Sequence, residues 1–341
     1  LYFHVITFFS HTLLYLFNKS TKMEHRYNQS LHGWYRNISR VVKNGDSVFL
    51  RRPNGNSYED ILFKECDIQI NAISAWLVEN GFKKGDRLGF LMDNCPEYLL
   101  VDQGLMQIGG VNVSVYPTLA ENDAAYILND SQCKFLFVGS AFLMKKALKI
   151  IDQVPSLIKI ISLIEDKSQN NRIINYKSLI EEGKALYPAR KEEIEKVFEQ
   201  VKRDDICTLI YTSGTTGVPK GVMLSHGNIM SNAESGVSMI KFIDHRDSYL
   251  SFLPLSHVFE RMATYGISLY CGCEISFAQS IDTIAKNILE IKPSVMATVP
   301  RLLERIEARV KKNALSGKKY KVAIFNWAVS VGNEARILRE D

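Results

Sequence analysis

The sequence lacks a strong excess of charge of one sign, and it contains no low-complexity tract or internal repeat. Its 341 residues include 42 lysines and arginines against 37 aspartates and glutamates, a net charge of +5. Proteins that bind nucleic acid usually concentrate basic residues in a patch or stripe. Here basic and acidic residues are interleaved, as in residues 190–205, which is typical of a solvated helical face. We therefore do not expect a nucleic-acid partner.

Cysteine is also scarce. The six cysteines are scattered, and most of them lie within apolar runs, where a thiol behaves as a small hydrophobic group. Cys271 and Cys273 form the one close pair. Two thiols without a second pair of ligands cannot complete a tetrahedral zinc site. We expect a reduced, cytoplasmic protein without a zinc centre.

A long apolar run that would comfortably span a membrane, which takes about 20 residues, is missing as well. Residues 1–22 open the sequence on a shorter apolar run with no basic segment before it, and Met23 offers a sensible soluble start. Three interpretations stay open for this run: upstream DNA translated in frame, a membrane anchor, or a signal sequence. We favour the first and expect the run to be dispensable.

From about Asp46, short apolar segments alternate with amphipathic ones. The predicted strands are residues 87–93, 111–117, 133–139, 158–166, 206–212, 221–226, 248–254, 273–278 and 294–300. The predicted helices are residues 96–110, 119–131, 141–154, 257–270, 282–291 and 301–312. This alternation predicts an α/β fold with mainly parallel sheets covered by helices on both faces. Residues 167–205 interrupt it, and we expect a surface excursion with one or two helices there. We expect a first lobe over residues 23–224 and a second, incomplete lobe over residues 225–341.

The segment Tyr211–Gly221, "YTSGTTGVPKG", contains glycines, hydroxyl groups and one cation. It is not a P-loop, because Pro219 has no backbone N–H for a phosphate and Gly221 has no hydroxyl for magnesium. The segment after Lys220 also predicts a strand, whereas a P-loop opens a helix. A dinucleotide-binding G-x-G-x-x-G pattern fails too, since only Gly214 and Gly217 are in place.

What remains is a strand, a loop and a second strand. Glycines let backbone amides approach a ligand closely, hydroxyl groups donate hydrogen bonds without adding negative charge, and the Lys220 ammonium is a mobile point charge. Such a loop suits a polyphosphate that is first held and then released as a leaving group.

The extended segment "YTSGTTGVPKGVMLSHGN" resembles the signature of the adenylate-forming (AMP-binding) enzymes, which include acyl-CoA ligases, luciferases and peptide-synthetase adenylation domains. The segment "SYEDILF" resembles the family's early helix-start motif. "FLPLSHVFERM", "KPSVMATVPRLLERI" and Tyr116–Thr118 resemble the long-chain fatty acyl-CoA ligases among them. The resemblance runs from about Val42 to the end of the chain. It implies the N-terminal large domain of the adenylate-forming fold, with two doubly wound, mainly parallel sheet lobes, ending before the small C-terminal domain.

The resemblance also implies a two-step reaction: a long-chain fatty acid and ATP form an acyl-adenylate, and coenzyme A then displaces AMP. Lys220 and His257 would be catalytic, and Thr212 would contribute to a Mg²⁺ site. The residues that would bind the triphosphate of ATP are Thr212, Ser213, Gly214, Thr215, Thr216, Gly217 and Lys220. The adenine-binding, ribose-binding and C-terminal catalytic residues would lie beyond Asp341, so we expect no ligase activity from the chain alone.

Several assignments stay open at this stage. Glu260 and Arg261 follow His257 and could form a local ion pair, and Arg301 is either a crevice residue or a surface residue. Peripheral contact with a membrane and formation of a homodimer stay open. So do two other functions: an inactive homologue that binds fatty acid or nucleotide, and a ligase for another carboxylic acid.

Overall fold

The computed structural model describes residues 25–42, 45–165, 170–213, 218–240, 242–317 and 319–340. The predictions for residues 1–22 fall outside these ranges. The chain divides into two compact units, residues 1–296 and 297–341, which we describe separately. In the part of the chain that the structure describes, no helix is both long enough and apolar enough to cross a membrane.

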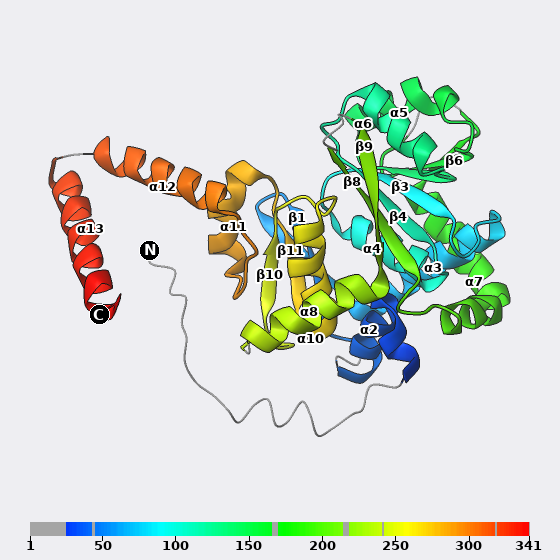
Figure 1. Ribbon diagram of the computed structural model, residues 1–341, viewed down its shortest axis with the longest axis horizontal. Coiled ribbons are helices and arrows are strands. Elements are labelled where there is room, and N and C mark those ends of the chain that lie inside the picture. The colour runs from blue at the N-terminus through cyan, green and yellow to red at the C-terminus, as the bar shows by residue number, and fades with distance from the viewer. Residues whose placement is uncertain are drawn as a thin grey trace. The chain divides into compact units, whose positions relative to one another are not determined.

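The larger sheet has seven strands in the order β7-β6-β5-β3-β4-β8-β9 (Figure 1). Its strands are β3 Arg87–Leu91, β4 Val111–Val115, β5 Phe135–Val138, β6 Lys159–Ser162, β7 Ile173–Asn175, β8 Ile206–Ser213 and β9 Pro219–Ser225. Neighbouring strands are parallel except for β9, which runs antiparallel to β8. The chain passes from β3 to β4 on one side and then returns to β5 on the other side of β3. This reversal confirms the predicted doubly wound arrangement.

Helices cover both faces of this sheet, which is why its central strands β3, β4 and β5 are buried along almost their whole length. One hydrophobic cluster joins Phe90 of β3 to Trp76 and Tyr98, and a second joins Leu136 of β5 to Leu128 and Ala147. The helices of the first face are α3 Phe63–Glu79, α4 Pro96–Gln107 and α7 Tyr176–Glu199. Those of the second face are α5 Glu121–Asp130 and α6 Ala141–Ile150, followed by the short η3 Ile151–Gln153 (Figure 1).

The expected surface excursion is mainly one helix, α7, of 24 residues. It is also part of the core, since Leu179, Ile194 and Phe198 are buried against the layer below. Close contact between α7 and α3 depends on Gly183, where an added Cβ would lie 2.1 Å from the Ala72 carbonyl oxygen.

The smaller sheet has four strands in the order β10-β11-β1-β2. These are β1 Val48–Asn54, β2 Ser57–Leu62, β10 Ser248–Ser251 and β11 Glu274–Phe277, and β2 alone is antiparallel to its neighbour. The β1–β2 hairpin turns through Gly55, whose φ of 59° suits a two-residue hairpin loop. The predicted helix start in "SYEDILF" falls at its last residue: residues 57–62 form a strand, and α3 begins at Phe63.

The hairpin also shows that sheet membership does not follow the order of the chain. Although it lies within residues 23–224, β1 pairs with β11 through Leu50↔Ile275 and Arg51↔Ser276. The lobe boundaries at residues 224 and 225 stay a prediction.

The remaining helices of the first unit pack around the smaller sheet and the β8–β9 hairpin. They are η1 His25–Gln29, α2 Leu31–Asn37, η2 Ile38–Val42, α8 His226–Ile240, α9 Val258–Glu260, η4 Arg261–Gly266, α10 Ile267–Cys271, η5 Ile281–Thr283 and α11 Ile284–Ile291. The predicted strand over residues 294–300 is wrong. Val295 makes one isolated bridge to Tyr249, and Pro300 begins a helix. Residues 297–341 contain the helices α12 Pro300–Leu315 and α13 Lys319–Glu340.

We predict that Gly183→Ala lowers the free energy of unfolding by about 3 kcal/mol, because overpacking outweighs the better helix propensity of alanine. Urea unfolding of the purified chain measures the change. The matched control is Gly236→Ala in α8, where the nearest atom to an added Cβ is Ile267 Cδ1 at 3.5 Å. That variant should be more stable by roughly 0.5–1 kcal/mol. Equal effects of the two substitutions would contradict this account of the α3–α7 contact.

Candidate functional site

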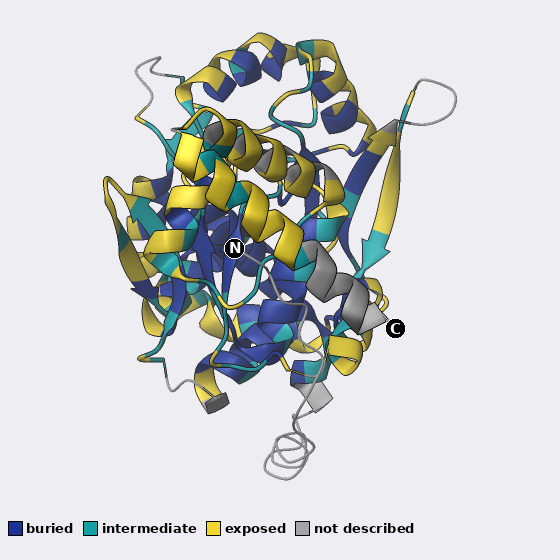
Figure 2. Cartoon of the chain, turned by 90° about the vertical axis from the view of Figure 1, so that its left-hand side faces the viewer, coloured by how far each residue is buried: buried dark blue, intermediate teal, exposed yellow. Residues whose placement is uncertain are grey.

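The β8–β9 hairpin brings two of the predicted site residues together. Its register pairs Thr212 with Lys220 and Ser213 with Pro219, and the side chains of Thr212 and Lys220 are exposed. Directly paired residues place their side chains on the same face of a sheet. A hydroxyl group and an ammonium group therefore stand side by side where β8 ends, and β9 is an exposed edge strand there (Figure 2).

The residues between these strands, Gly214, Thr215, Thr216 and Gly217, lie outside the described residues, as does the side chain of Ser213. Their assignment to the phosphates stays a prediction. What the structure confirms is the predicted frame of strand, loop and strand.

Gly221 has a packing role at the base of this hairpin. The ring of Tyr211 lies across it, so that a Cβ at residue 221 would come within 2.9 Å of Tyr211 Cζ. The Tyr211 hydroxyl donates a hydrogen bond of 2.5 Å to Asp130 Oδ2 of α5. Glycine is needed here because the tyrosine ring occupies the space of a side chain, which fixes the strand that carries Lys220.

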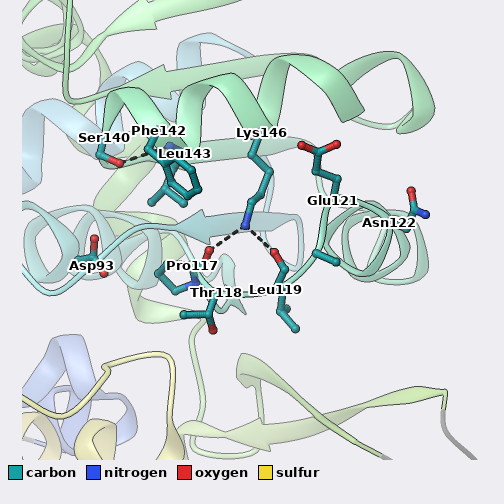
Figure 3. Close-up of a pocket in the computed structure, with 11 residues that line it drawn as sticks. Asp93, Pro117, Thr118, Leu119, Glu121, Asn122, Ser140, Phe142, Leu143 and Lys146 are labelled. Carbon is teal, nitrogen blue, oxygen red and sulfur yellow. Dashed lines mark hydrogen bonds between the residues drawn. The ribbon is translucent and has the colours of Figure 1, made fainter.

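A cavity of about 790 Å³ opens beside the carboxyl ends of β3, β4 and β5 (Figure 3). Ligand crevices form at this edge of doubly wound sheets, where the strand order reverses. The residues that line it are Asp93, Pro117, Thr118, Leu119, Ala120, Glu121, Asn122, Ser140, Phe142, Leu143 and Lys146. The sequence did not predict this cavity, although Tyr116–Thr118 lies at the end of the strand predicted over residues 111–117.

Lys146 is the cationic residue in the lining of this cavity, and its ammonium group is already hydrogen-bonded to backbone carbonyl oxygens. Figure 3 shows its ammonium group reaching from α6 to the turn after β4, where it donates hydrogen bonds to the carbonyl oxygens of Pro117, at 2.8 Å, and Leu119. The side chain therefore orders the β4–α5 turn. Of the two acids that line the cavity, Glu121 forms an ion pair with Lys149 at 2.6 Å, so the rest of the lining offers Asp93 and neutral polar groups.

His257 lies at the start of α9, where its side chain caps the helix. The backbone N–H of Phe259 donates a hydrogen bond of 3.1 Å to His257 Nδ1. This bond makes Nδ1 an acceptor, so the proton of the neutral imidazole is on Nε2. The ring is exposed.

The comparisons with known proteins agree with this fold and this motif. Residues 39–335 match the family model described as "AMP-binding enzyme". The chain belongs to the AMP-binding enzyme family.

Curated relatives within this family carry acyl-CoA ligase names. The chain is 30% identical over 296 residues to the human long-chain-fatty-acid–CoA ligase ACSBG2, covering 86% of this chain and 44% of that protein. It is 28% identical over 304 residues to the ACSBG2 ligase of Xenopus laevis, covering 87% of this chain and 41% of that protein. The chain thus spans less than half the length of these relatives.

A solved structure of the long-chain-fatty-acid-CoA ligase FadD1 from Archaeoglobus fulgidus superposes with a TM-score of 0.67. It is 20% identical and covers 85% of this chain and 55% of that one. This likeness confirms the predicted fold, the large α/β domain of adenylate-forming enzymes.

Glu260 and Arg261 of this AMP-binding enzyme do not pair with each other, so the local ion pair that we considered is wrong. Arg261 Nη2 donates to both carboxylate oxygens of Asp102, each at 2.9 Å, and both side chains are fully buried. Glu260 instead accepts a hydrogen bond of 2.6 Å from Ser251 Oγ. Consecutive residues of a helix point in directions about 100° apart, so each side chain finds its own distant partner.

Burial also changes the acidity of Glu260. Loss of water raises the pKa of its carboxyl group to about 7, against the opposing hydrogen bond from Ser251. Among the residues that the structure describes, no cation forms an ion pair with this carboxylate, and Arg261 pairs with Asp102 instead.

The structure does not decide two further assignments. Arg301 lies in the first turn of α12, and its side chain is outside the described residues. Among the residues that the structure describes, no three histidine, cysteine or acidic side chains gather as metal ligands. The role of Thr212 toward Mg²⁺ therefore stays a prediction.

We predict that Glu260→Gln stabilises the chain in a pH-dependent way. An acid with a raised pKa in the folded state binds protons more tightly there than in the unfolded state, so stability falls as pH rises from about 4.5 toward 7. Glutamine keeps the oxygen acceptor for Ser251 and removes the charge. The variant should gain about 3 kcal/mol over the parent at pH 8 and less than about 1 kcal/mol at pH 5.

Thermal unfolding at a series of pH values measures this difference. Glu181→Gln, which alters a carboxylate whose side chain is 73% exposed, is the matched control and should change little. A parent and a Glu260→Gln variant with the same stability profile would refute the buried, uncompensated carboxylate.

Proposed function

We propose that the protein carrying this chain activates a long-chain fatty acid with ATP, forming an acyl-adenylate and pyrophosphate, and then transfers the acyl group to coenzyme A with release of AMP. The observation that carries the proposal is the pairing of Thr212 with Lys220 next to the glycine- and hydroxyl-rich segment that joins β8 to β9. The ligase names of the curated relatives support the choice of substrates.

The chemistry of the first step explains the choice of residues. When the carboxylate attacks the α-phosphate, negative charge accumulates on the departing pyrophosphate, and fixed donors and cations lower the energy of that state. Lys220 supplies a cation beside the loop, and the loop between Ser213 and Gly217 would supply amide and hydroxyl donors.

Magnesium fits this arrangement as a partner of the phosphates. Mg²⁺ prefers oxygen ligands and usually keeps water and substrate phosphates in its coordination shell, so the single hydroxyl of Thr212 would suffice as a protein ligand. The bound ion would neutralise phosphate charge.

The cavity at the carboxyl ends of β3, β4 and β5 is our candidate for part of the coenzyme A site. Its polar lining, with Thr118, Asn122 and Ser140, offers hydrogen bonds to the amide and hydroxyl groups of coenzyme A. An acyl chain would gain little from such groups, because burying them unpaired costs free energy.

The cytoplasmic location stays a prediction, and membrane contact and a homodimer stay open.

We predict that Lys220→Ala and Thr212→Ala, made in the protein that carries this chain, lower fatty-acid-dependent pyrophosphate exchange about a hundredfold. Fatty-acid binding should not change, because both side chains belong to the phosphate hairpin. The control is Lys159→Ala, at the amino end of β6 in the same sheet, where the ammonium group donates to the Asn171 carbonyl oxygen. It should leave exchange unchanged.

Exchange at the parent rate in both hairpin variants would overturn the assignment of the hairpin. The same assay, repeated with acetate, benzoate and palmitate, separates the alternatives. Exchange that responds to benzoate alone would indicate another carboxylic acid. Bound palmitate without any exchange in the parent protein would indicate an inactive binding homologue.

A further inference from the structure

The carboxyl ends of the two sheets meet at one side chain, Asn94. It follows β3 of the larger sheet and contacts the segment that follows β10 of the smaller sheet. Asn94 Nδ2 donates to the Leu253 carbonyl oxygen at 2.6 Å and to Ser251 Oγ at 3.1 Å. The backbone N–H of Leu255 donates to Asn94 Oδ1 at 2.8 Å. Both the donor and the acceptor end of the amide are thus engaged by residues 251–255.

Glu260 holds the same segment from the other end. Ser251 Oγ accepts from Asn94 and donates to Glu260 Oε1 at 2.6 Å, and Glu260 is 1% exposed. The side chains of Asn94, Ser251 and Glu260 therefore form one chain of hydrogen bonds from the larger sheet through β10 to α9, in which Ser251 and Glu260 are buried and Asn94 is half-buried. We refer to these three residues as the clamp.

His257 lies between the two ends of the clamp. Its backbone N–H donates to the Pro254 carbonyl oxygen at 2.9 Å, and its ring caps α9 through Nδ1. The turn before His257 is fixed by Asn94, and the helix after it is fixed by Glu260. The direction of Nε2, the nitrogen that the helix cap leaves available, thus depends on both.

We propose that Asn94 and Glu260 are positioning residues that hold His257 at the edge where the strands of both sheets end. The part that His257 plays in catalysis rests on the proposed function, whereas its placement by the clamp does not. Asp93, the neighbour of Asn94, lines the cavity described above. One short segment after β3 therefore contributes to the cavity and fixes the histidine.

Substitutions that remove the hydrogen bonds of Asn94 or of Glu260 test the clamp. Asn94→Asp keeps the acceptor for Leu255 N–H but loses the donor for Leu253 and Ser251. Glu260→Ala loses the acceptor for Ser251, and Glu260→Gln restores it. The matched control is Asn175→Asp, because Asn175 also lies at the end of a parallel strand, accepting from Lys177 N–H at 2.9 Å and donating to the Ile164 carbonyl oxygen at 3.0 Å.

Nuclear magnetic resonance of chain labelled in its histidine rings reports the environment of His257, with His257→Gln identifying its signals. We expect Asn94→Asp and Glu260→Ala to shift the ring signals of His257 and to accelerate exchange of its backbone amide about tenfold, the effect of losing one hydrogen bond. Glu260→Gln and Asn175→Asp should leave both properties as in the parent. Unchanged His257 signals in Asn94→Asp, or equal shifts in Asn175→Asp, would overturn the proposal.

A measurement on the unaltered chain covers the case in which Asn94→Asp does not fold. The side-chain amide protons of Asn94 should exchange with solvent about tenfold more slowly than those of an exposed asparagine, and rapid exchange would refute the clamp. In the protein that carries this chain, loss of the clamp should lower kcat while leaving KM for ATP near the parent value. A parent protein without exchange activity but with shifted His257 signals in the variants would refute the proposed function and leave the clamp standing.

Discussion

The buried ion pair between Asp102 and Arg261 ties the two sheets of the first unit together. Asp102 lies in α4, which covers the larger sheet, and Arg261 begins the helical turn after α9, beside the smaller sheet. Two charges without water are costly unless their remaining hydrogen bonds are satisfied. The acid of this pair has a further partner, whereas Arg261 Nε and Nη1 have no hydrogen-bond partner among the residues that the structure describes. Asn112 of β4 donates to Asp102 Oδ1 at 2.8 Å, and Ser114 in turn donates to Asn112 Oδ1 at 3.0 Å. The position of α9, and with it of His257, is thus set from within the larger sheet.

The local part of this fold could be predicted from the sequence because its causes are local. Apolar runs such as Phe135–Val138 are strands because both of their faces are buried, and Pro96 marks the first turn of α4. The β8–β9 hairpin was also predicted from local sequence. Two predicted strands flank the segment Tyr211–Gly221, which fits neither the P-loop pattern nor the dinucleotide-binding pattern.

The parts that were missed depend on partners far away in the chain. Strand β1 pairs with β11 through Leu50 and Ile275, and the sequence around Leu50 does not predict which strand it pairs with. Arg261 was considered with its neighbour Glu260 because the acid that it contacts, Asp102, is 159 residues away. Asn94 was missed although it stands between a strand and a helix that begins with proline. Such a position also suits a simple turn, and its contacts with residues 251–255 appear only in three dimensions.

The antiparallel edge strand distinguishes the polyphosphate site that we propose from a P-loop. In a P-loop the phosphates meet the N-terminus of a helix, so the loop must lead into that helix. Here the chain returns as β9, and Lys220 stands opposite Thr212 instead of at a helix start. An edge strand leaves one row of its backbone groups unpaired, and the loop that joins it to β8 is anchored on both sides by ladder hydrogen bonds. Tyr211 locks this ladder by packing on Gly221 and bonding to Asp130. The two strands are therefore paired up to Ser213 and Pro219, and a proposed site for a departing pyrophosphate gains from donors whose positions are fixed in advance in this way.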